Sequence, residues 1–243
     1  MSGRGHRWRE GLNATPSNAP DETPPTDSTT TEDTTFRLIL CDEDPEVLEA
    51  WNRRFLGRLD IDVYKGDVVH AEADALLLPG NSFGFLESGL ELRVWETMGM
   101  EVQDRIRQRI RDDYGGELLV GQAFIERIPA PGRPLIYTPL WRSPCAVTDT
   151  VNVYLAVRAA LLALIADTGS PPLQTIAVPS MGVNPGGLHP AVSARQINYG
   201  LKVGSGKTGS GGKNLTRIIR RERKLRALPK PETSDNGDAF EDE

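Results

Sequence analysis

Two glycine-containing loops are the segments whose residue types and spacing are suited to binding a ligand. They are LLLPGNSFGFLESGL, residues 76–90, and IAVPSMGVNPGGLHP, residues 176–190. Each runs from an apolar, strand-like segment into the start of a helix. Backbone N–H groups at helix amino termini bind phosphate, and glycine lets the backbone approach it closely. The pair of loops predicts an anion held from both sides, although glycine could also serve only the tight turns of each loop.

Asn81 and two phenylalanines stand out within the first loop. Asn81 follows the apolar segment directly, so its amide could hold a sugar hydroxyl beside the anion. Phe83 and Phe85 could cover a bound ligand or fill the core, and we expect them in the core.

Strands and helices alternate along the part of the chain that carries these loops. Expected strands cover residues 36–41, 61–67, 74–80, 123–128, 135–141 and 175–181, and expected helices cover residues 45–56, 90–99, 102–114, 148–166 and 191–203. The apolar second half of the longest helix should be mostly buried. Such alternation predicts a mixed or mainly parallel sheet with helices on both faces, and ligands bind such sheets beyond the carboxyl ends of the strands.

Composition divides the chain into three parts. Residues 1–35 are rich in Ser, Thr, Pro and acidic residues and predict a disordered polar tail. Residues 36–203 form the expected folded domain. Residues 204–243 begin with GSGKTGSGGK, which has the composition of a flexible linker, and continue with a basic stretch and an acidic tail.

Charge and composition narrow the classes of function. The net charge is −6, so general attraction of the whole surface to nucleic acid or anionic lipid is not indicated. The two cysteines, Cys41 and Cys145, form no disulfide framework or thiolate metal cluster, and the three histidines lack the spacing of metal ligands. With no leader or apolar span in view, we expect a soluble cytoplasmic protein without a metal or cofactor.

The ordered motifs resemble those of the macro domains, which bind ADP-ribose. YKGDVVHAEADALLLPGNSFGFLESGLELRVWETMG is similar to the opening signature of that family. IAVPSMGVNPGGLHPAVSARQ is similar to its second phosphate loop and following helix, especially in a bacterial and phage-type subgroup. The resemblance spans residues 36–203 and implies a three-layer α/β/α sandwich with a mixed, mainly parallel central sheet.

The resemblance also implies a role for each matching residue. Asp67 would accept a hydrogen bond from the adenine amino group, Val68 would pack beside the base, and Asn81 would contact the distal ribose. Five glycines would bring backbone donors to the diphosphate, namely Gly84, Gly89, Gly182, Gly186 and Gly187. Without the resemblance, Asp67 could equally cap a turn. The implied partner is ADP-ribose or an ADP-ribosylated macromolecule.

Departures from the family pattern leave two alternatives open: a domain that only binds ADP-ribosyl groups, and a hydrolase that removes them. Leu78 replaces the first of two asparagines in the commoner signature, and Glu91 stands where catalytic members often carry an aspartate. In a hydrolase, a water attacking the distal ribose linkage would be oriented by Asn81 and a carboxylate, with Glu91 the first candidate and Glu87 the second. Both acids could instead simply favour the helix start that they occupy.

A second function class rests on the basic carboxyl-terminal segment. NLTRIIRRERKLRALPK predicts an amphipathic helix whose apolar face would contain Leu215, Ile218, Ile219, Leu225 and Leu228. Residues 204–229 contain eight Lys or Arg against one Glu. Such a helix, within residues 214–229, could bind nucleic acid, an acidic partner or the protein's own acidic surface, in a non-catalytic binding module. The sequence specifies no oligomeric state.

Overall fold

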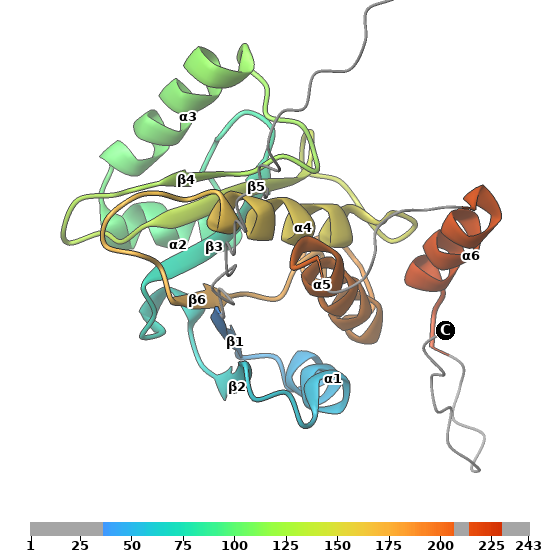
Figure 1. Cartoon of the computed structure of the whole chain (residues 1–243). Helices are drawn as coiled ribbons and strands as arrows, with labels where there is room; N and C mark the ends of the chain where they lie inside the picture. Colours follow the sequence, from blue (N-terminus) through green and yellow to red (C-terminus); the bar gives the residue numbers. More distant parts are fainter. Residues whose placement is uncertain (1–35, 207–213, 230–243) are drawn as a thin grey trace, which may run out of the picture. The chain divides into compact units, whose positions relative to one another are not determined.

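The computed structural model describes residues 36–206 and 214–229 (Figure 1). The expected disordered tail over residues 1–35 lies outside the described residues. So do most of the expected linker, residues 207–213, and the acidic tail, residues 230–243.

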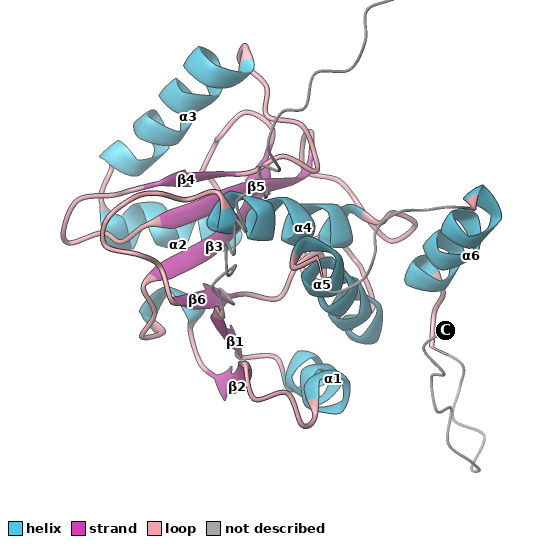
Figure 2. Ribbon diagram, in the orientation of Figure 1, coloured by secondary structure: helices cyan, strands magenta, loops and turns pink. Residues whose placement is uncertain are grey.

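Six strands form one sheet with the order β2-β1-β6-β3-β5-β4. Their bounds are β1 Arg37–Asp42, β2 Ile61–Lys65, β3 Ala75–Asn81, β4 Phe124–Glu126, β5 Leu135–Trp141 and β6 Thr175–Val178. Neighbouring strands are parallel except for the pair β4 and β5 (Figure 2). The mixed, mainly parallel sheet expected from the sequence is therefore confirmed.

Helices occupy the segments in which the sequence predicts them. Their bounds are α1 Pro45–Phe55, α2 Gly89–Met98, α3 Glu101–Tyr114, α4 Asn152–Ile165, α5 Pro190–Gly204 and α6 Leu215–Arg226, with a short 3₁₀ turn, η1, at Val68–His70. Helix α5 continues one residue past the domain boundary expected at Val203. A Cβ added at Gly204 would lie only 2.9 Å from Leu161 Cβ, so the missing side chain lets α5 pack closely on α4.

Alternating side chains divide the core between the two faces of the sheet. Leu77 of β3 joins a buried cluster with α1, α4 and α5, whereas Leu76 and Leu78 join a second cluster with α2 and α3. The sheet is therefore covered by helices on both faces, as a three-layer sandwich requires (Figure 1).

The apolar second half of α4 is only partly buried. Leu161 and Leu164 face the core, but Leu162 is 41% exposed and Ile165 is 51% exposed. One sheet can cover only one side of a helix of 3.6 residues per turn, so these two residues are exceptions to the mostly buried second half that the sequence predicts.

Candidate functional site

Both glycine loops follow the carboxyl ends of neighbouring strands, so they lie at the same end of the sheet. Strands β3 and β6 are adjacent and parallel, with Leu76 opposite Ala177. Because parallel strands end at the same side, the first loop after Asn81 and the second loop after Val178 emerge at the same carboxyl edge. This is the arrangement that the shared anion site predicted from the sequence requires.

A third segment, which follows β5, touches both loops. Ser82 N donates to Arg142 O at 3.1 Å, and Val147 N donates to Gly186 O at 2.9 Å. The segment of residues 142–151 therefore joins the two loops along the carboxyl edge.

The side chain of Asn81 organises the first loop from within. Its Oδ1 accepts hydrogen bonds from Phe83 N at 3.1 Å and Phe85 N at 3.3 Å. Its Nδ2 donates to Phe85 O at 2.7 Å and to Glu91 Oε1 at 3.3 Å. Asn81 is only 5% exposed, so in this structure its amide holds its own loop rather than presenting itself to solvent.

Glu91 is a partly buried carboxyl group beside this amide. Burial raises its pKa to about 8, and the hydrogen bonds from Asn81 oppose part of that rise. The carboxyl group is therefore mostly protonated at neutral pH. A group that titrates near pH 8 can exchange a proton with a bound molecule in either direction.

Tyr137 of β5 completes this polar cluster. It was not among the residues predicted from the sequence. Its hydroxyl donates to Asn81 O at 2.7 Å and accepts from Asn81 N at 3.1 Å. A Cβ at Gly80 would lie 2.4 Å from the same hydroxyl, so Gly80 makes room for it. Burial raises the pKa of Tyr137 as well. A tyrosine inside a largely apolar strand needs a buried partner for its hydroxyl, and that need was the signal available in the sequence.

The glycines of the two loops differ in what surrounds them. Gly84 has a φ of +76°, and a Cβ there would lie 2.9 Å from Ile106 Cγ2 of α3. Gly89 has a φ of +56°, and a Cβ there would have no heavy atom within 4 Å. Gly84 therefore serves packing, whereas Gly89 begins α2 with open space in front of its backbone.

The second loop is tightly folded on itself. Gly187 N donates to Val183 O and Leu188 N donates to Gly182 O, both at 2.8 Å. A Cβ at Gly186 would lie 2.5 Å from Gly182 O. The turn itself therefore requires glycine at position 186, which agrees with the alternative that the glycines serve the tight turns of the loop.

Asp67 and Val68 lie beside α2, at the end of β2. Asp67 Oδ1 accepts from Val69 N at 2.9 Å, and Asp67 Oδ2 lies 3.1 Å from Arg93 Nη1. Val68 is buried, with 3% exposure. Asp67 thus caps the η1 turn, as the alternative reading allowed, and also pairs with the helix that follows the first loop.

The two phenylalanines of the first loop lie outside the core. Phe85 is 37% exposed, with the Arg107 guanidinium 4.2 Å from its ring centroid, and Phe83 is half-buried beneath Arg142 at 4.9 Å. The expectation of core phenylalanines is wrong, because Asn81 turns the loop backbone out of the sheet. The arginines supply local positive charge on a chain whose net charge is −6.

Other candidate groups stay apart from this arrangement. Glu87 is exposed. Cys41 is buried and donates to Gly66 O, and burial raises its pKa, while Cys145 is a free, exposed thiol. Within residues 36–206 and 214–229, no three His, Cys, Asp or Glu side chains are grouped to hold a metal ion. The same residues include no helix with the length and apolarity to cross a membrane.

Comparisons with known proteins give distant relatives. No protein-family model matches the chain. An uncharacterized protein of Aquifex aeolicus is 26% identical over 139 residues, which cover 57% of this chain and 79% of that one. An uncharacterized protein of Aeropyrum pernix is 25% identical over 160 residues, 66% of this chain and 78% of that one.

Several solved macrodomains are similar in structure. The macrodomain of Mycobacterium tuberculosis DarG has a TM-score of 0.44 and 19% identity, over 58% of this chain and 86% of that one. A point mutant of the Oceanobacillus iheyensis macrodomain has a TM-score of 0.47 and 16% identity, over 64% and 90%. The Trypanosoma brucei macrodomain in complex with ADP-ribose has a TM-score of 0.44 and 17% identity, over 60% and 58%.

Proposed function

We propose that this chain binds ADP-ribose, or an ADP-ribosyl group on a macromolecule, at the carboxyl edge of β3 and β6. The observation that carries the proposal is that two glycine loops, about one hundred residues apart in the sequence, leave adjacent parallel strands at the same edge. The ordered motifs that resemble the macro domains fall on these loops and on the η1 turn.

The diphosphate would lie between the two loops. Gly89 provides open backbone at the amino terminus of α2, where orphan N–H groups and the helix dipole favour an anion. Gly182, Gly186 and Gly187 shape the opposite wall. Asp67 and Val68, beside α2, would receive the adenine, and Asn81 would hold the end of the loop nearest the distal ribose.

Calorimetry on the full chain tests this function. We expect ADP-ribose to bind more tightly than AMP or ATP. Gly89→Ala should weaken that binding at least tenfold, because its methyl group would stand in the open space before the α2 amides. Gly57→Ala is the matched control, since Gly57 has a φ of +79° and equally open surroundings at the far end of α1. Equal heats for the three nucleotides would refute the proposal.

Hydrolysis of an ADP-ribosyl linkage is a second step of the same proposal. The observation that favours it is the Glu91 carboxyl group, with a pKa of about 8, 3.3 Å from Asn81 Nδ2. As a base, Glu91 must lose its proton, so release of ADP-ribose from an ester-linked protein should rise with pH through about 8. Glu91→Gln should abolish release and exposed Glu87→Gln should retain it. Equal rates in the two variants would remove Glu91 from the reaction.

Nucleic-acid binding through α6 is the alternative. Leu215, Ile218 and Ile219 are exposed on α6, so most of the apolar face predicted there is uncovered by the described residues. Arg217 and Arg220 are exposed on the same helix. If the alternative holds, Arg217→Glu with Arg220→Glu will weaken RNA or DNA binding and reduce its salt dependence, while ADP-ribose affinity stays unchanged. Unchanged nucleic-acid affinity would remove the alternative.

A further inference from the structure

The carboxyl-terminal end of α6 is docked on α5. Leu225 is 4% exposed, unlike the other apolar residues of this helix. Arg195 of α5 donates from Nη2 to Ala227 O at 2.8 Å and from Nη1 to Lys224 O. These donors satisfy carbonyl groups that a helix end leaves unpaired, and their positive charge suits the negative end of the helix dipole.

Gln196 of α5 connects α6 with the segment that follows β5. Its Nε2 donates to Thr150 O at 2.8 Å and to Leu225 O at 3.4 Å, and its Oε1 accepts from Tyr154 N at 3.2 Å. Gln196 is fully buried. One amide thus joins α6, α4 and the turn at residues 147–150.

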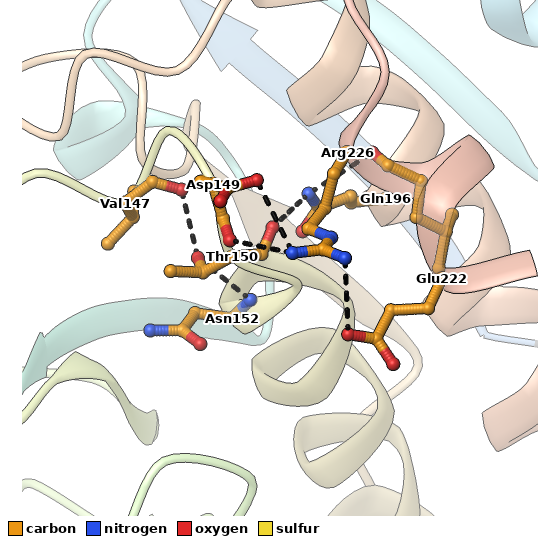
Figure 3. Close-up of polar contacts among 8 residues, drawn as sticks. Val147, Asp149, Thr150, Asn152, Gln196, Glu222 and Arg226 are labelled. Atoms are coloured by element: carbon orange, nitrogen blue, oxygen red, sulfur yellow. Dashed lines mark hydrogen bonds and ion pairs between the residues drawn. The ribbon is translucent and has the colours of Figure 1, made fainter. Parts of the chain in front are cut away.

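Arg226 of α6 contacts the same turn. Its Nη1 lies 3.3 Å from Asp149 Oδ1 and 3.5 Å from Asp149 O, and Glu222 flanks it at 3.8 Å (Figure 3). Thr150 closes the turn, with both its N and its Oγ1 donating to Val147 O (Figure 3). Gln196 and Arg226 therefore both bind the turn.

The far side of this turn supports the second glycine loop. Val147 N donates to Gly186 O at 2.9 Å. A Cβ built at Gly186 would lie 2.8 Å from Val147 Cγ2, and one built at Gly187 would lie 3.3 Å from Thr148 Cγ2. A shift of the turn would therefore move the loop backbone directly.

We propose that docked α6 is a positioning element for the second glycine loop, with Leu225 as its anchor and Gln196 and Arg226 as its links to the turn at residues 147–150. The inference rests on the proposed ADP-ribose site. Undocking α6 would loosen the turn and misplace the backbone groups of Gly186 and Gly187. In this way a helix that is not part of the three-layer sandwich would affect the affinity of the site for ADP-ribose.

Two matched pairs of variants in the full chain test this role. Leu225→Ser should raise the Kd for ADP-ribose about tenfold, whereas exposed Leu215→Ser on the same helix should leave it unchanged. Arg226→Ala should raise the Kd about threefold, a smaller effect because ion pairs at the surface are weak. Arg220→Ala removes the same charge from an exposed position and should have no effect.

Amide hydrogen exchange supplies a readout that needs no ligand. The amides of Gly187 and Leu188, which are hydrogen-bonded within the second loop, should exchange faster in Leu225→Ser than in the wild type or in Leu215→Ser. Unchanged exchange and unchanged Kd in Leu225→Ser would overturn the positioning role. Equal losses of affinity in Arg226→Ala and Arg220→Ala would overturn it too, because α6 would then act through charge alone.

Failure of the proposed function remains distinguishable from failure of this inference. Absence of ADP-ribose heat in the wild type would refute the function, and the exchange comparison would still decide whether α6 docking orders the loop.

Discussion

The two glycine loops leave neighbouring strands at one edge, yet they are held in place by different means. The first loop depends on polar side chains that are buried or partly buried. Asn81 binds the loop backbone, Tyr137 holds Asn81, and Gln103 accepts from Leu86 N at 2.8 Å. The second loop depends on its own backbone hydrogen bonds and on close apolar packing against Val147.

This difference assigns different capacities to the loops. The first loop lies against the carboxyl group of Glu91 in α2, whose pKa is raised to about 8 by burial and whose Oε1 is 3.3 Å from Asn81 Nδ2. This wall of the site can therefore take part in proton transfer and should respond to pH. The second contains no acid or base between Pro179 and Leu188, so this stretch can contribute only its shape, its backbone dipoles and the neutral side chains of Ser180 and Asn184. We therefore expect the wall formed by the first loop to take part in proton transfer, and the wall formed by the second loop to bind the ligand without proton transfer.

Asn81→Ala should have the largest effect, because the first loop depends on this side chain. We expect unfolding free energy to fall by about 4 kcal/mol, since the amides of Phe83 and Phe85 would lose their acceptor. Urea denaturation measures the change, and exposed Asn52→Ala on α1 serves as the control. A loss below about 1 kcal/mol would show that the first loop, like the second, is held mainly by its backbone.

Gly186→Ala tests the second loop in the same way. The added methyl group would stand 2.5 Å from Gly182 O, so we expect a loss of about 3 kcal/mol. Gly66→Ala is the control, because its nearest neighbour would be Cys41 Sγ at 3.8 Å, an ordinary contact. Should the two variants unfold at the same urea concentration, the tight packing assigned to the second loop would be wrong.

Glu91→Gln should change the pH dependence of stability. The pKa of Glu91 in the fold, about 8, lies above the ordinary value of 4.5, so the fold holds this proton more tightly than the unfolded chain does. The stability that protonated Glu91 contributes is present below pH 4.5 and is lost as the pH rises to about 8.

The wild type should therefore lose stability, on the order of a few kcal/mol, across a pH interval in which Glu91→Gln loses less. Denaturation curves at several pH values, with Glu87→Gln as the control, measure this difference. Parallel curves for the wild type and Glu91→Gln would contradict the raised pKa.

Phe85→Ala should have the smallest effect. A core phenylalanine costs about 3–5 kcal/mol when truncated, but Phe85 is 37% exposed and contacts the Arg107 guanidinium. We expect a loss of about 1 kcal/mol, much of it from the cation–π contact. Phe124→Ala is the comparison, because Phe124 is buried and its truncation should cause the full loss of unfolding free energy expected for a core phenylalanine. A similar loss of unfolding free energy in both variants would show that Phe85 is packed as a core residue.

Local signals in the sequence were sufficient for most of the fold. Asp44 and Pro45 mark the start of α1, and Asp44 Oδ1 accepts from Glu46 N as a capping residue should. The run of leucines before Asn81 is long and apolar because β3 is buried on both faces. Periodicity and caps act within a few residues, and so one sequence could predict them.

Partners that are distant in the sequence could not be predicted in this way. Tyr137 meets Asn81 across 56 residues, and Arg226 meets Asp149 across 77 residues. Neither contact leaves a mark in the local pattern, because it depends on which strands pair and where a helix docks. The outward placement of Phe85 was missed for the same reason, since the loop path follows from the hydrogen bonds of Asn81.

The sequence by itself determined the strands, the helices and the two glycine loops, because local periodicity and turn chemistry specify them. Only the tertiary structure decided that β6 inserts between β1 and β3, which brings both loops to one edge. It also decided that burial beside Asn81 raises the pKa of Glu91, since burial is a property of packing rather than of neighbours in the chain.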